Sequence, residues 1–225
     1  MNRRFSSYLF PSQGPLQHAD ERMSGVRSLS FKVFFIICTL FLPLSTLAQA
    51  PKEVVAVPAA MNGFIPKGYK ALNLTRGDLN RDAYPDAVLV LYKTGEEKTS
   101  DVISHPEKRP LMLLLGQPDK SYKLAARSNN AVYCVDCGGQ MGDPFTGITI
   151  KNGYFSVEHY GGSGHRWTRI VTFRFSPADK KWYLFKDGGE RFHATSPEEV
   201  KTEVKTAKNF GVIPFERFNI YMEEE

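Results

Sequence analysis

One stretch of the chain places oxygen-bearing side chains at alternate positions, so that a tight loop can turn them inward together toward a hard metal cation. The side chains at loop positions 1, 3, 5 and 9 are Asp78, Asn80, Asp82 and Asp86. Position 7 is Tyr84, whose backbone carbonyl supplies a further oxygen. Ca²⁺ takes about six to eight oxygen ligands around one centre. The spacing therefore predicts a structural Ca²⁺ site, with a turn that only caps its own backbone as the alternative.

A second motif brings two cysteines within four residues, Cys134-Val135-Asp136-Cys137, and is followed by two glycines. A redox pair would need Cys134 at a helix N-terminus, where the helix dipole lowers the thiol pKa. A zinc site would need a second pair of ligands at a matching spacing. The glycines and the surrounding strand signals favour a third interpretation, a short structural disulfide between Cys134 and Cys137.

A glycine-rich segment further along the chain carries residues that suit a ligand-facing surface, namely His159, Ser163, His165 and Trp167. Loops of this composition are either plain connections or binding surfaces. The nearness of Ser163 and His165 also raises a hydrolase, in which residues 161–167 act with Glu158, His159 or His165. The G-x-S-x-G pattern is not met, because the residue two beyond Ser163 is a histidine. The segment is therefore either a plain loop, which the composition favours, or a ligand-binding surface, with the hydrolase as a further alternative.

Strand signals with a period of two dominate the chain beyond residue 66. The expected strands are 86–93, 110–115, 121–126, 148–150, 154–160, 166–175 and 181–185. The Asn152-Gly153 pair between two of them is the strongest short hairpin signal. The pattern predicts an all-β protein made mainly of antiparallel hairpins, either a propeller-blade-like or a sandwich-like unit.

A single segment near the C-terminus carries a helical signature. Ser196 can cap a helix and Pro197 suits its first position. Val200, Val204 and Ala207 share one helical face before Gly211 and Pro214 end the pattern, and acidic residues occupy the first turn. We therefore expect one short C-terminal helix over residues 196–210.

Residues 1–50 have the features of a leader. Arg27 and Lys32 precede a short apolar run over residues 33–42, and the small-residue stretch Ala48-Gln49-Ala50 follows. This order is typical of a secretory signal peptide. The apolar run is shorter than the roughly 20 residues that a membrane-spanning helix needs, so no membrane anchor is expected after cleavage. Met23 is a plausible true start, and a folded N-terminal arm is the alternative.

The rest of the chain is expected to hold an irregular opening segment (51–66) and a single β domain (67–225). The leader contains five of the 29 basic and two of the 24 acidic residues, which leaves a net charge of +2. Near-neutral, interleaved charge predicts no nucleic-acid partner. The even cysteine pair suits an oxidising compartment.

The loop and the strand that follows it resemble the calcium loop of FG-GAP and VCBS-type repeats, the blade units of integrin-like β-propellers. The similar residues are Gly77-Asp78-Leu79-Asn80-Arg81-Asp82, Pro85-Asp86 and Leu113-Leu114-Leu115-Gly116-Gln117-Pro118-Asp119-Lys120-Ser121-Tyr122. The resemblance covers residues 72–122 and implies that Asp78, Asn80, Asp82 and Asp86 are side-chain ligands, with Tyr84 as the carbonyl ligand. Ala83 departs from the family, which prefers glycine there, and the unit occurs once, so a closed propeller is not expected.

One such loop followed by a CxxCGG segment also resembles small secreted proteins of Gram-negative bacteria, and this resemblance implies no activity. The sequence as a whole predicts a periplasmic or secreted, non-catalytic binding module with a structural Ca²⁺ loop. Its expected partner is an envelope protein or glycan, and the sequence assigns no oligomeric state. A periplasmic hydrolase is the alternative function, and a thiol oxidoreductase using Cys134 and Cys137 is a third.

Overall fold

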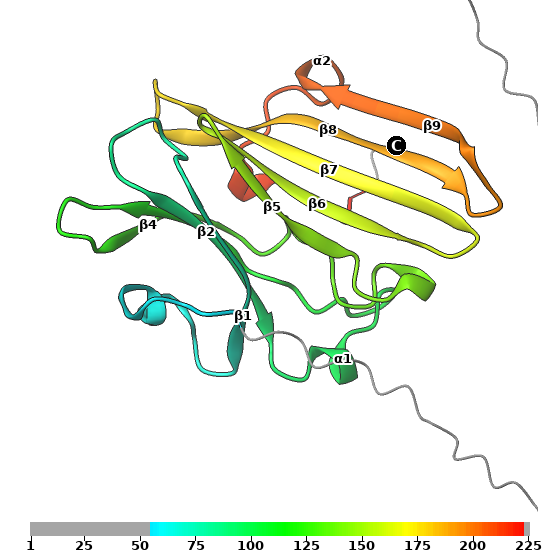
Figure 1. Ribbon diagram of the computed structural model, residues 1–225, viewed down its shortest axis with the longest axis horizontal. Coiled ribbons are helices and arrows are strands. Elements are labelled where there is room, and N and C mark those ends of the chain that lie inside the picture. Colours follow the sequence, from blue (N-terminus) through cyan, green and yellow to red (C-terminus); the bar gives the residue numbers. More distant parts are fainter. Residues whose placement is uncertain (1–54, 223–225) are drawn as a thin grey trace, which may run out of the picture. The chain divides into compact units, whose positions relative to one another are not determined.

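Two antiparallel sheets make up the fold in the computed structural model, which describes residues 55–222 (Figure 1). The predicted leader, signal peptide and start at Met23 lie outside this range. The first sheet contains β1 (Tyr69–Gly77), β2 (Asp86–Lys93), β3 (Leu111–Gly116) and β4 (Tyr122–Ser128). The second contains β5 (Phe145–Lys151), β6 (Tyr154–Gly162), β7 (His165–Ser176), β8 (Lys181–His193) and β9 (Ser196–Thr206). The all-β prediction is confirmed, and a sandwich-like unit fits it.

The helices of the described residues are all short. They are the 3₁₀ turns η1 (Ala59–Phe64), η2 (Gly139–Met141) and η3 (Phe215–Arg217), and the α-helices α1 (Glu96–Thr99) and α2 (Ala207–Phe210). None of the helices between residues 55 and 222 has the length and apolar character needed to cross a membrane.

The main core lies between the two sheets. The first sheet contributes alternate residues of β2 and β3, among them Val88, Val90, Leu111 and Leu113. The second sheet contributes Phe155, Val157, Val171, Phe173 and Trp182. Phe155 and Phe173 stack with their ring centroids 4.9 Å apart. Alternation along each strand delivers one face of each sheet to this core, as expected for antiparallel sheets.

The other face of the first sheet is also covered. Ala87, Leu89 and Leu91 of β2 and the corresponding residues of β3 pack against Met61, which lies in η1. Both faces of β2 are therefore buried, which explains why its sequence is an unbroken apolar run instead of an alternating one. Residues 55–66, which include η1, act as a third layer over the first sheet.

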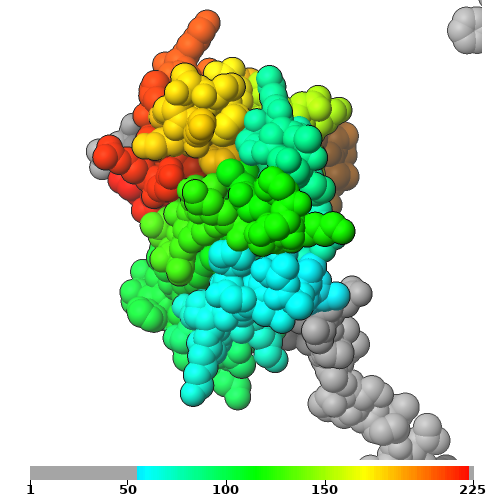
Figure 2. Space-filling model, turned by 90° about the vertical axis from the view of Figure 1, so that its left-hand side faces the viewer, coloured from blue at the N-terminus to red at the C-terminus, as the bar shows by residue number. Residues whose placement is uncertain are grey.

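The C-terminal segment closes one side of the core. Phe215 and Phe218 are buried, and the Phe215 ring meets the rings of Phe155 and Phe173 edge-on. The backbone N–H of Leu184 donates to Ile213, and that of Ile220 donates to Asn130. The segment is thereby tied to β8 and to the loop after β4. Figure 2 shows it (red) beside the yellow strands of the second sheet.

The helix expected from Ser196 is wrong, because residues 196–206 form strand β9, paired with β8. Val200 and Val204 share a face in a strand as well as in a helix. The threonines and valines that alternate with charged residues there favour the extended conformation, since β-branched side chains restrict χ1 in a helix. The helix begins only at Ala207, with Thr206 as its N-terminal cap, and it ends at Phe210.

Candidate metal centre and ligand-binding surfaces

The acidic loop connects β1 to β2 and contacts the second sheet directly. Leu79, within the loop, is fully buried in the core between the sheets. The indole N–H of Trp182 donates to the Leu79 carbonyl at 3.2 Å. The Gly153 N–H donates to the Asp78 carbonyl at 3.2 Å, and the Arg81 side chain donates to the Asn152 carbonyl at 3.1 Å. The loop of the first sheet thus docks on the Asn152-Gly153 turn of the second.

Asp86 is the buried anchor of the loop. Its two carboxylate oxygens accept the backbone N–H groups of Leu79 at 2.8 Å and Gly116 at 2.9 Å. Gly116 is required there, because a Cβ atom would lie 2.3 Å from the carbonyl oxygen of Pro85. Burial raises the pKa of Asp86, the two N–H donors oppose this shift, and the negative charges of Asp82 and Asp78 add to it.

The remaining acidic and amide side chains cap successive backbone N–H groups. Asp78 accepts from Arg81 at 2.5 Å, Asn80 accepts from Asp82 at 3.0 Å, and Asp82 accepts from Tyr84 at 2.7 Å. Between residues 55 and 222, no group of three or more His, Cys, Asp or Glu side chains is placed to hold a metal ion. The Ca²⁺ site therefore stays a prediction, and the capped turn is the arrangement described here.

The charge of the loop nevertheless suits a cation. Three carboxylates lie near one another, and no ion pair of residues 55–222 involves any of them. A carboxylate offers about four lone-pair sites, so each one can accept an N–H group and still bind a metal. The sharp turn falls at Arg81, with φ of 65°, and not at Ala83. The alanine that departs from the family pattern therefore causes no backbone strain here.

The two cysteines form a disulfide, as predicted, with their Cα atoms 5.1 Å apart. Cys134 is fully buried and lies in a loop outside the helices, so the pair lacks the exposed helix-terminal thiol of a redox motif. Asp136, between the cysteines, accepts hydrogen bonds from the Ser100 hydroxyl at 2.6 Å and the Val102 N–H at 2.8 Å. The disulfide loop thereby fixes the loop that precedes β3.

A buried arginine, Arg109, joins the segment that precedes β3 to the end of the disulfide loop. Arg109 is fully buried and binds Glu96 through two nitrogens, at 2.6 and 3.2 Å. Two 2.7 Å bonds connect the same guanidinium to both carboxylate oxygens of Asp143. Sequence reasoning missed this cluster, because Glu96 and Arg109 lie in a polar stretch that resembles a solvated loop. The bidentate geometry is the kind that stabilises a buried charge.

The four residues predicted to form one ligand surface do not share an exposed surface. His159 and Trp167 both pack edge-on against the Tyr133 ring, while Ser163 and His165 lie at the turn between β6 and β7. His159 is buried on the inner side of β6, at 2% exposure, so its assignment to a surface is wrong. Trp167 is half-buried, and its indole lies over Gly161, where a Cβ atom would come within 2.5 Å of it. Ser163 and His165 are exposed, and His165 packs edge-on against His193 with centroids 4.9 Å apart.

Two of the residues that the alternative hydrolase would use, Glu158 and His159, lie on opposite faces of the second sheet. Successive residues of a strand point to opposite faces. Glu158 binds Thr149 at 2.7 Å on the exposed face of the sheet, while His159 faces the core. Among the hydrogen bonds of the described residues, none joins the Ser163 hydroxyl to a histidine. Glu158 and His159 therefore cannot act on one substrate.

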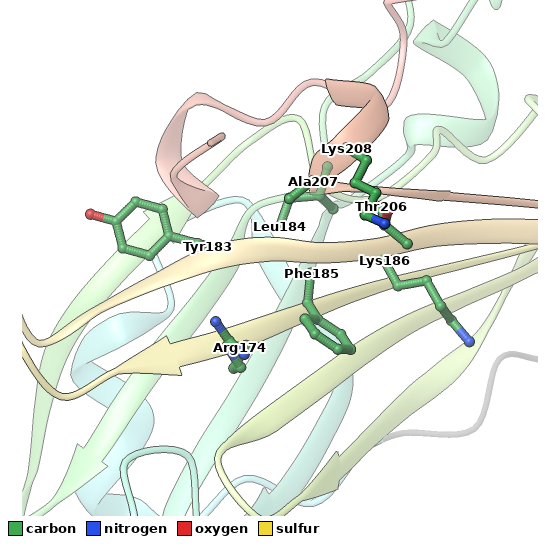
Figure 3. A pocket seen from close by; sticks show the side chains of 8 residues that line it. All are labelled: Arg174, Tyr183, Leu184, Phe185, Lys186, Thr206, Ala207 and Lys208. Atoms are coloured by element: carbon green, nitrogen blue, oxygen red, sulfur yellow. The ribbon is translucent and has the colours of Figure 1, made fainter. Parts of the chain in front are cut away.

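A pocket of about 280 Å³ lies elsewhere on the second sheet, where sequence reasoning expected no site. Figure 3 shows its lining: Arg174, Tyr183, Leu184, Phe185, Lys186, Thr206, Ala207 and Lys208. The charged side chains of this lining are all cationic. The Arg174 guanidinium lies 5.3 Å from the centre of the Phe185 ring. The pocket forms where β9 meets α2. The sequence did not indicate this junction, because its pattern predicts one continuous helix over residues 196–210. The arrangement suits an anionic group carried on a ring that stacks on an aromatic side chain.

Comparisons with protein-family models, curated proteins and solved structures returned no match for this chain. Its function is therefore inferred from its own residues and their contacts.

Buried His159 should make the stability of the fold depend on pH. Burial lowers its pKa to about 3, and the charges of Arg169 and Arg109 contribute to this shift. Its Nε2 atom accepts the Tyr133 N–H at 3.3 Å, which requires the neutral ring. The unfolded chain takes up a proton below the ordinary histidine pKa of about 6.5, and the folded chain does not. Stability present at neutral pH is therefore lost as the pH falls.

The expected loss from His159 is about 1.4 kcal/mol of unfolding free energy for each pH unit below about 6. Urea unfolding at several pH values measures it. His159→Gln should lower this slope by about 1.4 kcal/mol per pH unit, which is the contribution of one proton. His165→Gln, the same change at an exposed position, controls for the substitution itself. An unchanged slope in His159→Gln would show that the folded protein protonates this ring.

Proposed function

We propose that this protein is an exported, non-catalytic binding module whose acidic loop is stabilised by Ca²⁺. The observation that carries the proposal is the position of the loop, which connects the two sheets through Leu79 and Asp78. A cation bound there would offset the repulsion among Asp78, Asp82 and Asp86. The Cys134–Cys137 disulfide supports an oxidising compartment.

Asp78, Asn80 and Asp82 would hold the ion with their side-chain oxygens, together with Asp86 and the Tyr84 carbonyl. The metal would supply charge neutralisation and would fix the loop against the second sheet. At about 1 mM Ca²⁺ and a Kd of about 0.1 mM, it would add about 1.4 kcal/mol to the stability of the fold.

Calcium should therefore raise the midpoint of thermal unfolding by about 3–5 °C over the value in excess EGTA. Asp82→Ala should abolish this shift, because it removes a carboxylate ligand of the proposed site. The Asp82 side chain is exposed, so the substitution leaves the core unchanged. Asp119→Ala, in the exposed turn between β3 and β4, should keep it. A shift of equal size in all three proteins, or no shift in any, would rule out the loop as the site.

The pocket between β8 and α2 is the ligand-binding surface that this proposal assigns to the module. Its lining contains the cations Arg174, Lys186 and Lys208 and the aromatic residues Tyr183 and Phe185, with the Arg174 guanidinium 5.3 Å from the centre of the Phe185 ring. Sugar rings stack on aromatic faces, and carboxylates pair with exposed lysines. We therefore assign the pocket to a carboxylate-bearing glycan of the envelope.

Titration of a uronic-acid oligosaccharide into the protein tests this assignment by calorimetry. Replacing Lys186 and Lys208 by glutamine should weaken binding about three- to tenfold, since each exposed pair contributes little alone. The effect should shrink at high salt. Lys151→Gln, an exposed lysine outside the pocket, should leave the affinity unchanged. Equal losses in both variants would mean that the oligosaccharide binds through general charge.

A further inference from the structure

Strand β9 ends the second sheet with an unpaired edge. It pairs with β8 on one side, and no strand of residues 55–222 pairs with its other side (Figure 1). Nearly every residue of the strand is exposed. A long free edge presents unsatisfied N–H and C=O groups and is a template for pairing with another strand.

The two faces of β9 carry different chemistry. One face bears the β-branched side chains of Val200, Thr202 and Val204, and the valines are 44% and 51% exposed. The other face bears charges of alternating sign, and these residues are Glu199, Lys201, Glu203 and Lys205. An exposed valine on an edge strand gains a stabilising cross-strand neighbour when another strand pairs with that edge.

The sequence of β9 is complementary to itself when it is reversed. In an antiparallel pair centred on Thr202, residue numbers on opposite strands add up to 404. Glu199 then faces Lys205 of a second copy, Lys201 faces Glu203, and Val200 faces Val204. Every charge of this segment meets its opposite, and every valine meets a valine. Opposite charges and β-branched residues are the cross-strand pairs that stabilise sheets.

The pairing of β9 with β8 within one chain also favours a second strand at the open edge of β9. Lys201 lies directly opposite Arg191 of β8, so two cations face each other across the β8–β9 pair. Like charges in this position destabilise a sheet. Glu203 of a second copy, on the open side of Lys201, would offset that repulsion. Along the other face, Ile170 and Val204 flank Gly188, and the facing valine would extend this apolar row.

We propose that two copies of this chain associate through β9, antiparallel and centred on Thr202, to form one continuous sheet. The contact is isologous, so it closes as a dimer and does not propagate. The alternating charges set the register, because a shift of the pairing by two residues places like charges opposite each other. The acidic loop and the disulfide loop contribute no residue to this edge.

Sedimentation velocity of the purified protein tests the dimer. Lys201→Glu places two glutamates opposite each other twice in the dimer, and should raise the dissociation constant about tenfold or more. Lys201→Glu combined with Glu203→Lys restores opposite pairs and should return the constant close to the wild-type value. Lys181→Glu, an exposed position outside β9, should have no effect. A wild-type monomer at high concentration, or equal weakening in the single and double variants, would overturn the proposal.

A cysteine at the centre tests the register. In a Cys38→Ser background, Thr202→Cys should form a dimer linked by a disulfide when a mild oxidant is added, because directly opposed residues have Cα atoms about 4.5–5.5 Å apart. Val200→Cys should not crosslink, since its equivalent in the second copy lies four residues away along the strand. Equal crosslinking of both variants, or of neither, would contradict the proposed register. Unchanged circular dichroism shows that each variant folds.

Discussion

The contact between the two sheets depends on one buried carboxylate, Asp86. An ionised side chain without exposure to water needs hydrogen-bond donors, and here the backbone N–H groups of Leu79 and Gly116 supply them. The first bond folds the loop back over β2 and directs Leu79 into the core. The second ties the loop to the end of β3. Because Leu79 then accepts the Trp182 indole N–H, one carboxylate sets the approach of the second sheet.

Polar anchors of the same kind hold the opposite end of the molecule. Arg109 joins the segment before β3 to the disulfide loop, and Arg169 binds Asp187 and the Tyr133 hydroxyl. Arginine suits both places, because its planar fork satisfies two carboxylate oxygens at once. By contrast, nearly every residue of β9 is exposed. The proposed dimer edge lies along this strand, and the proposed glycan pocket lies at its C-terminal end, where Thr206 and α2 meet β8.

Local sequence patterns predicted the elements whose conformation is determined by residues close together in the chain. The unbroken apolar run of β2 and the Asn152-Gly153 turn needed no distant information, and both are found as expected. Strand β9 was missed because Val200 and Val204 satisfy two periods, and only pairing with β8 decides between them. The burial of His159 and the ion cluster of Arg109 arise from contacts between distant segments, which no local spacing reveals. The acidic loop was recognised by spacing, but its role in joining the sheets depends on Trp182 and Gly153.

Amide hydrogen exchange at Leu79, Gly116 and Gly153 tests the central role of Asp86 most directly. The account predicts that all three amides exchange as slowly as those of the core strands in the wild-type protein. In Asp86→Ala, Leu79 and Gly116 should lose their protection, and Gly153 should lose it with them, because the loop that binds it is released. Slow exchange at Gly153 in that variant would contradict the account, since the second sheet would then hold its place without the loop.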